Sequence, residues 1–334
     1  MTVLVTGGAG YIGSHVVRVL RERGDAVVVV DDLSGGSLNR LGRVANEMID
    51  LAMAESVDKI REVIRAHRID SVIHLAAKKQ VGESMARPAW YAQQNIGGLA
   101  NLLIAMNAEA VTRLVYSSSA AVYGATEGAA IEESAPTTPI NPYGFTKLVG
   151  EQLIAQSTEP SGLRGASLRY FNVAGSGWDE LGDTSVSNLI PMVFARVDAG
   201  MPPTIFGDDY GTPDGTCIRD YVHVLDLVAA HLAALDATAL GDPGVVTYNV
   251  GTGIGTSVRD IVDLIGFVVG GALPAVVEQR RPGDADIVVA NPSKIQRELG
   301  WTATRSLDEI VASSWSAHLA QRAPGRMGSS QRPS

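Results

Sequence analysis

The feature that most constrains the fold is a glycine-rich turn close to the N-terminus. The apolar run Val3–Val5 leads directly into a turn with Gly7, Gly10 and Gly13, and a helical pattern then continues to Arg23. Glycines at this spacing let the backbone turn tightly and approach a pyrophosphate, which the free N–H groups and the positive helix end stabilise. The turn therefore predicts a dinucleotide site at the start of an α/β fold.

An acidic residue follows where such a site needs one. Asp31 ends the second apolar run, Val27–Val30, and lies 18 residues after Gly13. A carboxylate at this distance is typical of sites that bind the ribose hydroxyls of adenosine, and it repels a 2′-phosphate. The pattern therefore predicts NAD rather than NADP. Neighbouring Asp32 is an alternative for this role, and the structural alternative is an ordinary turn followed by a solvated acid.

Strand and helix patterns alternate through the first half of the chain. Further apolar runs lie at Ser71–Leu75, Arg113–Tyr116 and Ala166–Tyr170. The helical patterns between them lie at Ser56–His67, Ala89–Asn107 and Pro142–Gln156. This alternation predicts an α/β protein built on a Rossmann-type, doubly wound parallel sheet.

The composition changes after Gly175, where Gly, Asp and Pro become frequent and the elements shorten. We expect residues 1–174 to form the dinucleotide-binding domain and residues 175–322 to form mainly a smaller mixed α/β domain that binds the substrate. Some segments of the second part are expected to return to the first domain, and residues 323–334 to form a flexible tail. Two domains suit a chain of 334 residues, since a typical domain has roughly 100–200.

Composition excludes several function classes. With 27 basic and 36 acidic side chains the net charge is −9, a poor field for binding nucleic acid. The single cysteine, Cys217, cannot form an intrachain disulfide or a thiolate zinc cage, and the six histidines lack metal-ligand spacing, so we expect no metal. We find no secretory signal, and Asp263 and Pro274 interrupt the apolar stretch 261–277, so a cytoplasmic protein without a membrane partner is expected.

Three side chains are candidates for proton transfer. Asn141 and Pro142 predict a helix start, which places Tyr143 and Lys147 on one helix face. A tyrosine usually titrates near ~10, and a nearby cation together with a positively charged nicotinamide favours its phenolate. Ser119 follows a predicted strand at the sheet edge where ligands bind, and could hydrogen-bond a substrate hydroxyl. The alternative for the serine is a polar turn.

Two other features lie near predicted strand ends. Lys78 and Lys79 follow the Ser71–Leu75 strand, where one could bind ribose or pyrophosphate, or both could be solvated. A second glycine cluster, 251–255, precedes a helix, but Thr256 stands where a third fingerprint glycine is needed. Because Thr256 or Ser257 suits a helix N-cap, we expect no dinucleotide there.

These segments resemble the extended short-chain dehydrogenase/reductase superfamily, and within it the enzymes that epimerise UDP-hexoses at C4. The resemblance extends to about residue 320. It is carried by Val3–His15, Val81–Ser84, Ser117–Gly124, Asn141–Gly144, Leu168–Asn172 and Asp214–Val224.

The resemblance implies that Tyr143 is the acid/base, that Lys147 is its electrostatic partner and a nicotinamide-ribose ligand, and that Ser119 orients the hydroxyl. For NAD it adds the following residues to the glycine turn: Tyr11, Ile12, Asp31, Asp50, Leu51, Lys79 and Phe171. We expect Leu75 and Ala76, at a strand end, to line the same site. For the nucleotide sugar, beside Ser119 and Tyr143, it implies Asn172, Asn188, Leu189, Thr204, Phe206, Arg219, Arg281 and Asp284.

The implied activity is the interconversion of UDP-galactose and UDP-glucose by reversible C4 oxidation with tightly bound NAD, through a 4-keto sugar. A homodimer is also implied, with the 148–154 helix face as a candidate contact.

Two positions depart from the pattern. Gln94 replaces a usual asparagine, and Val288 stands where some of these enzymes have a large tyrosine, which would leave room for UDP-GalNAc and UDP-GlcNAc.

Two alternatives stay open. One is another NAD-dependent nucleotide-sugar epimerase, decarboxylase or dehydratase of the same superfamily. A 4,6-dehydratase needs an acid pair after the catalytic serine or threonine, yet Ser119 is followed by Ala120 and Ala121. The other is a non-catalytic NAD-sensing regulator, which would have no need of Tyr143, Lys147 and Ser119 together.

Overall fold

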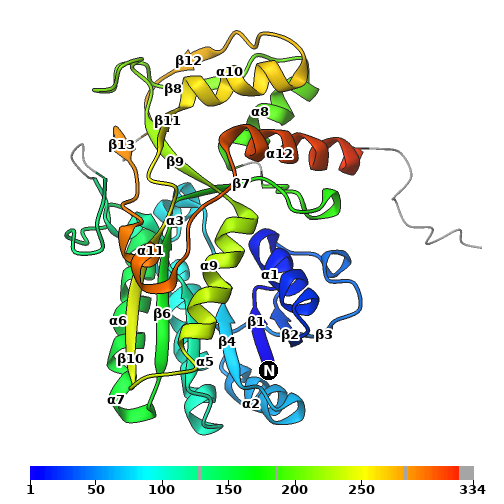
Figure 1. Ribbon diagram of the computed structural model, residues 1–334, viewed down its shortest axis with the longest axis vertical. Helices are drawn as coiled ribbons and strands as arrows, with labels where there is room; N and C mark the ends of the chain where they lie inside the picture. The colour runs from blue at the N-terminus through cyan, green and yellow to red at the C-terminus, as the bar shows by residue number, and fades with distance from the viewer. Residues whose placement is uncertain (126–129, 186, 282–283, 323–334) are drawn as a thin grey trace, which may run out of the picture.

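Seven parallel strands form the framework of the larger half of the molecule (Figure 1). The computed structural model describes residues 1–125, 130–185, 187–281 and 284–322, so the expected tail at 323–334 lies outside the described residues. In sheet order the strands are β10 (Gly244–Val250), β6 (Arg164–Tyr170), β5 (Arg113–Ser117), β4 (Ser71–His74), β1 (Thr2–Thr6), β2 (Ala26–Asp31) and β3 (Ala45–Met48). The doubly wound parallel sheet predicted from the sequence is confirmed.

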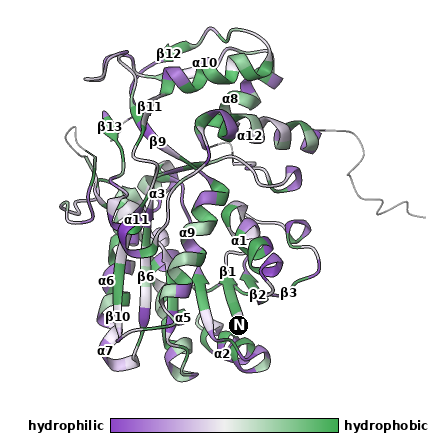
Figure 2. Ribbon diagram, in the orientation of Figure 1, coloured by the Kyte–Doolittle hydropathy of each residue, from purple (hydrophilic) through white to green (hydrophobic). Residues whose placement is uncertain are grey.

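Helices cover both faces of this sheet because alternate strand residues point to opposite sides. Val3 and Val5 of β1 pack with one set of helices, whereas Leu4 packs with the other. The first set contains α1 (Tyr11–Glu22), α9 (Val224–Ala237) and α11 (Ser293–Leu299), and the second contains α2 (Ser56–His67), α5 (Gly98–Ala108) and α6 (Pro142–Gln156). Figure 2 shows hydrophobic residues concentrated along the strands between these layers.

Among the described residues, the smaller half combines two short sheets with three α-helices. One sheet contains β7 (Asn172–Ala174), β9 (Ile218–His223), β11 (Gly255–Ser257) and β13 (Ile287–Val288), and the other pairs β8 (Thr204–Phe206) with β12 (Val276–Glu278). The helices are α8 (Leu189–Asp198), α10 (Val258–Val269) and α12 (Leu307–Arg322). Their buried faces share one core with Ile205 and Tyr221. Within the described part of the chain, no helix combines the length and apolar character needed to cross a membrane.

Three local features differ from the sequence expectations or refine them. Strand β3 was not expected, because Asn46 and Glu47 interrupt any apolar run, and all four of its residues are exposed. The expected helix 89–107 is divided into α4 (Pro88–Ala92), a π-helical turn (Gln93–Gly97) and α5. Strand β10 lies far beyond residue 174, yet it joins the large sheet beside β6. The short helices α3 (Val81–Ala86) and α7 (Thr158–Ser161) also belong to this half.

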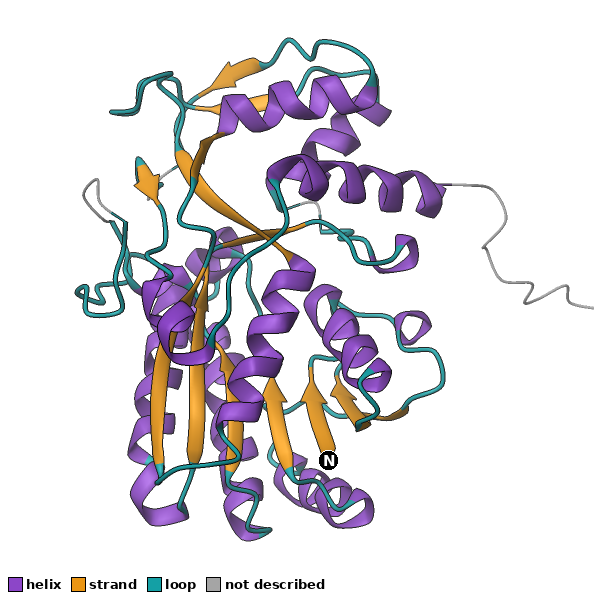
Figure 3. Cartoon of the chain, viewed as in Figure 1, coloured by secondary structure: helices purple, strands orange, loops and turns teal. Residues whose placement is uncertain are grey.

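The chain crosses between the two halves at strand ends. Strand β6 continues through Phe171 into β7, and β10 continues through residues 251–254 into β11. The carboxyl ends of the parallel strands face the smaller half (Figure 3). Because ligands of open α/β sheets bind at these ends, the fold places a ligand site between the halves.

The second glycine cluster binds a carboxylate of the protein itself. Backbone N–H groups of Thr252 and Gly253 donate to the two oxygens of buried Asp220, at 2.8 and 2.9 Å. The following helix is capped by the Ser257 hydroxyl, which accepts from Asp260 N. The cluster is therefore a structural turn, as its missing third glycine indicated.

Candidate active site

A cavity of about 1240 Å³ lies between the two halves. This volume exceeds the roughly 300–1,000 Å³ of a typical small-ligand pocket, so it has room for a dinucleotide and a second ligand. Every residue that the sequence analysis assigned to catalysis, cofactor or substrate lines it. The fold thus brings all of them together, while their individual roles stay predictions.

The glycine turn forms one end of the cavity. A Cβ atom on Gly13 would lie 2.1 Å from the Gly7 carbonyl oxygen, so only glycine allows this close approach. Helix α1 starts after Gly10, and no side chain caps its N-terminus. Its first N–H groups are therefore available to an anion, and the helix dipole adds positive potential there. These properties fit the pyrophosphate of a dinucleotide.

Asp31 lies at the end of β2 beside this turn. Its two carboxylate oxygens accept hydrogen bonds from Ala9 N at 2.9 Å and Leu33 N at 2.8 Å. Burial raises the pKa of Asp31, and the two backbone hydrogen bonds partly offset that effect. The fixed carboxylate retains lone pairs for ribose hydroxyls. Asp50 and buried Leu51, just beyond β3, line the same end of the cavity.

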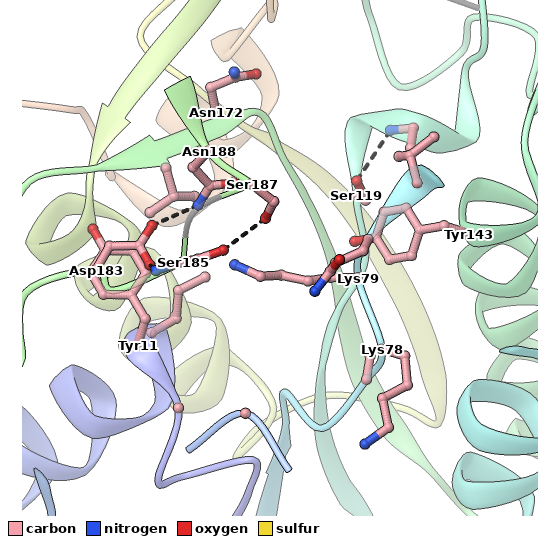
Figure 4. A pocket seen from close by; sticks show the side chains of 18 of the residues that line it. Tyr11, Lys78, Lys79, Ser119, Tyr143, Asn172, Asp183, Ser185, Ser187 and Asn188 are labelled. Atoms are coloured by element: carbon pink, nitrogen blue, oxygen red, sulfur yellow. Dashed lines mark hydrogen bonds between the residues drawn. The ribbon is translucent and has the colours of Figure 1, made fainter. Parts of the chain in front are cut away.

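Tyr143 is positioned by a close contact between α6 and the turn after β5. Asn141 caps the helix by accepting from Gly144 N at 2.8 Å. A Cβ on Gly144 would lie 2.4 Å from the Ala121 carbonyl oxygen, so glycine lets the helix approach the Ser119 turn. Ser119 and Tyr143 consequently lie side by side on one wall (Figure 4). Burial raises the pKa of the Tyr143 phenol, and its hydrogen bond with Ser119 lowers it in part.

Lys147 lies one helical turn after Tyr143 and is almost completely buried. Its ammonium donates to the Ser117 carbonyl oxygen at 2.7 Å, which ties the helix to the end of β5. Burial lowers the pKa of Lys147 to about 7, and the negative charge of Glu151 opposes this shift. A buried lysine with such a pKa, one helical turn from a tyrosine that lines the same cavity, is typical of a functional site.

The opposite side of the cavity carries two arginines. Arg219 on β9 donates to the Ile218 carbonyl oxygen at 2.8 Å and lies 3.6 Å from an Asp284 carboxylate oxygen. Arg281 lies over the ring of Phe206, 3.9 Å from its centroid. Guanidinium groups here can bind a diphosphate, since their geometry matches phosphate oxygens.

Asparagines and polar side chains line the wall opposite Tyr143 (Figure 4). Asn188 donates from its side-chain amide to Asp183 at 2.6 Å, and Ser185 N donates to the same carboxylate at 2.9 Å. Asn172 begins β7 at the crossing between the halves. Tyr11 fastens α1 to this region because its hydroxyl donates to the Gly175 carbonyl oxygen at 2.6 Å.

Sequence reasoning missed two buried residues behind the catalytic side chains. Asn95, in the π-helical turn, donates to Thr146 Oγ1 of α6 at 2.9 Å. Glu151 accepts from the Ser118 hydroxyl and forms an ion pair with Arg169 of β6 at 2.6 Å. The spacing of Glu151 one turn after Lys147 was the available signal. Its partners lie far apart in the chain, so no local pattern reveals them.

The described residues contain no group of three or more His, Cys, Asp and Glu side chains arranged to hold a metal ion.

Comparison with known proteins identifies the family. A family model described as the NAD dependent epimerase/dehydratase family matches residues 3–251. The chain belongs to this family. A UDP-glucose 4-epimerase from Azospirillum brasilense is 44% identical over 329 residues, which cover 96% of this chain and 93% of the relative.

Solved structures of family members share the fold. The UDP-glucose 4-epimerase from Bifidobacterium longum, in complex with NAD+ and UDP, matches with a TM-score of 0.89 at 36% identity, covering 96% of this chain and 98% of that chain. The UDP-Glc/GlcNAc 4-epimerase from the human pathogen Campylobacter jejuni matches with a TM-score of 0.81 at 33% identity, covering 95% and 99%.

Proposed function

We propose that this protein is an NAD-dependent UDP-glucose 4-epimerase, which interconverts UDP-galactose and UDP-glucose. The observation that carries the proposal is the place of Ser119, Tyr143 and Lys147 in the cavity. They lie between a dinucleotide cradle at one end and two arginines suited to a diphosphate at the other. The family contains enzymes named for this activity that match 96% of the chain.

The cofactor site fits NAD. The glycine turn and the uncapped start of α1 suit its pyrophosphate, and Asp31 suits the adenosine ribose. Lys147 would bind the nicotinamide ribose, while Leu51, Ala76 and Phe171 supply apolar walls. When bound, NAD would supply reversible hydride transfer at the sugar carbon that is oxidised.

Tyr143 is the acid/base in this proposal. It removes the proton of the sugar 4-hydroxyl as the 4-keto sugar forms, and it returns the proton when the alcohol is restored on the other face. Ser119, which already hydrogen-bonds Tyr143, holds the reacting hydroxyl near the phenol. Lys147 adds positive charge close by. Because burial raises the pKa of Tyr143, the phenolate requires this charge and that of the oxidised nicotinamide.

Inversion at C4 requires that the nucleotide be held firmly and the hexose loosely. Arg219 and Arg281 would hold the UDP diphosphate, with Asn188 and Phe206 beside them. The 4-keto sugar can then turn over between Tyr143 and the small-sheet wall. A hexose fixed by many hydrogen bonds could not rotate, so the firm contacts have to fall on the nucleotide.

A dehydratase is disfavoured by the turn after Ser119. Elimination of water across C5 and C6 needs an acid and a base beside the sugar, but Ala120 and Ala121 occupy that turn and line the cavity. A non-catalytic regulator is disfavoured by burial, since burying the charge of Lys147 in the same cavity as Tyr143 costs stability without serving a regulator.

A second substrate class is supported by Val288. This residue of β13 lines the cavity and is smaller than the tyrosine found at the matching position of some epimerases. The similar Campylobacter jejuni enzyme acts on both UDP-Glc and UDP-GlcNAc by its name. We therefore include conversion of UDP-GalNAc and UDP-GlcNAc in the proposal.

We also infer a homodimer in the cytoplasm. Ile104 of α5 and Phe145 of α6 leave 56% and 51% of their surfaces exposed, on two helices that pack together. Ile154, at the end of the expected contact face, lies instead in the core. Sedimentation equilibrium tests the dimer, and a monomer at micromolar concentration would contradict it. Cell fractionation tests the location.

The activity is tested with purified protein and UDP-galactose, without added cofactor. We expect UDP-glucose to form and the Tyr143→Phe variant to lose on the order of 10²-fold to 10⁴-fold in kcat, as loss of an acid/base does. Tyr248→Phe is the matched control, because Tyr248 is buried in the core on β10. Full turnover by Tyr143→Phe, or no turnover by the native protein, would refute the proposal.

A further inference from the structure

A lysine bridges two loops at the dinucleotide end of the cavity. Lys78 follows β4, and its ammonium donates to Asp32 Oδ2 at 2.7 Å and to the Ser34 hydroxyl. Asp32 and Ser34 follow β2 and are joined to each other, since Ser34 N donates to Asp32 Oδ1 at 3.0 Å. The three side chains line the cavity together with Gly10.

The order of the strands determines what this bridge spans. Strand β1 lies between β4 and β2 in the sheet. A contact from the loop after β4 to the loop after β2 therefore passes over the carboxyl end of β1, where the glycine turn begins. Asp31, which the proposed function assigns to the adenosine ribose, directly precedes Asp32 and lies at the same end.

The backbone of Lys78 is fixed independently of its side chain. Its N–H donates to Asn95 Oδ1 at 2.8 Å, and its carbonyl oxygen accepts from Asn95 Nδ2 at 3.0 Å. The same Asn95 amide donates to Thr146 of α6. The lysine thus extends from an anchored point, and less conformational entropy is lost when its ammonium reaches Asp32.

The contact is partly shielded from water. The side chains of Lys78 and Asp32 are 18% and 28% exposed. Burial alone would raise the pKa of Asp32, but the hydrogen bonds from Lys78 and Ser34 bring it below its usual value. Asp32 therefore keeps its charge at neutral pH, and the bridge is an ion pair rather than a neutral hydrogen bond.

We propose that Lys78, Asp32 and Ser34 are further residues of the cofactor site. They form a strap across the adenosine end, and this strap slows the release of NAD. An epimerase that returns the hydride to its own substrate gains nothing from exchanging its cofactor, so retention suits the reaction. The strap rests on the proposed function, because it assumes that NAD is the ligand.

The experiment measures NAD release from the holoenzyme. Protein loaded with radiolabelled NAD is mixed with excess unlabelled NAD, and bound label is counted after desalting at successive times. We expect Lys78→Met and Asp32→Asn each to release NAD on the order of 5-fold faster than native protein, as loss of one partly exposed ion pair predicts. The double variant should release it no faster than either single variant, since all three lack the same contact.

Two comparisons keep the test specific. Lys59→Met is the matched control, because Lys59 forms an exposed pair with Glu55 on α2, outside the cavity. Added salt should accelerate release from the native protein more than from Lys78→Met, because salt screens the ion pair.

Unchanged release in both single variants would overturn the strap. Faster release in Lys78→Met alone would overturn it as well, because Lys78 would then act on NAD without Asp32. A purified protein that neither holds NAD nor epimerises UDP-galactose would overturn the proposed function itself. A protein that holds NAD, epimerises, and releases NAD equally fast with and without Lys78 would overturn only the strap.

Discussion

The two sides of the cavity are built differently. On the large-sheet side, Ser119, Tyr143 and Lys147 come from one strand end and the helix packed against it, and their hydrogen bonds already exist in the protein alone. On the small-sheet side, Arg219 and Arg281 come from separate segments. Arg219 rests on a backbone carbonyl and lies 3.6 Å from an Asp284 carboxylate oxygen, and Arg281 lies over an aromatic ring.

The difference follows from what each side has to do. Proton transfer needs groups held in one arrangement, which burial and fixed hydrogen bonds provide at a cost in stability. Binding a flexible nucleotide sugar needs positive charge. In the free protein the arginines can make weak contacts, and the ligand can then replace these contacts. The comparison therefore suggests a preorganised catalytic wall and a wall that is completed by the substrate.

The largest expected effect comes from the cofactor cradle on the preorganised side. In Gly13→Ala the new Cβ would lie 2.1 Å from a backbone oxygen, so the turn has to move. We expect purified Gly13→Ala to contain no NAD and to have no measurable epimerase activity. Absorbance at 260 nm relative to 280 nm and an enzyme assay test this.

The matched control is Gly82→Ala, where a Cβ would meet no atom within 4 Å and the backbone is not in the left-handed region. This variant should retain NAD. If Gly13→Ala also retained NAD and activity, the glycine turn would be able to rearrange. That result would contradict the view that this side of the cavity is preorganised.

The second effect belongs to the small-sheet wall. Arg219→Met removes a charge proposed to bind the diphosphate, so we expect the KM for UDP-galactose to rise on the order of 100-fold while the NAD content stays unchanged. Steady-state kinetics over a range of substrate concentrations measure this. Arg297→Met, an exposed residue paired with Glu298, is the control.

A fall in kcat with unchanged KM would contradict the comparison, because Arg219 would then act in the chemical step. Loss of NAD would contradict it too, since the two walls would not be separable.

The third effect tests how the catalytic wall is held. Lys147 carries its charge below its pKa of about 7 and loses it as the pH rises through that value. The charge of Glu151 raises this pKa, so Glu151→Gln should lower it. We expect the alkaline decline of kcat to begin at a lower pH, and kcat near pH 8 to fall on the order of 10-fold. A kcat profile between about pH 5 and 9 measures this.

Glu151 also pairs with buried Arg169, so the substitution is expected to lower the free energy of unfolding by ~3–5 kcal/mol. Ser118→Ala provides a milder test, because it removes only the hydroxyl that donates to Glu151. A lower rate with an unshifted pH profile would show that Glu151 supports the fold but does not position Lys147.

These residues also show what the sequence can and cannot predict. The placement of the glycine turn, Asp31 and the Tyr143–Lys147 pair around one cavity was predictable, because each follows from spacing within one strand-helix unit. Strand β3 was not predictable, because its four exposed residues, two of them polar, form no apolar run. The role of Glu151 was not predictable, because only the fold brings its partner Arg169 close to it.

The small-sheet wall shows the same limit more clearly. Its residues have no common period, since they lie on separate short strands and loops, and only family resemblance assigned them. Conversely, the second glycine cluster resembled a nucleotide-binding turn. In the structure, however, its N–H groups bind the carboxylate of Asp220, a residue about thirty positions away in the chain. Local pattern predicts elements, whereas pairing between distant segments decides which of them form the site.

The smallest effect concerns specificity on the substrate-completed wall. Val288 is half-buried on β13 and lines the cavity, and Val288→Tyr adds bulk there. Turnover of UDP-galactose should stay within about 2-fold of native, while turnover of UDP-GalNAc should fall on the order of 10-fold or more, because the larger N-acetyl group needs the space. Parallel assays with the two substrates measure the ratio of their kcat/KM values. Val288→Leu, which adds less volume, should lie between. An equal loss with both substrates would mean that this position supports the wall as a whole, and that the wall is less adaptable than the comparison suggests.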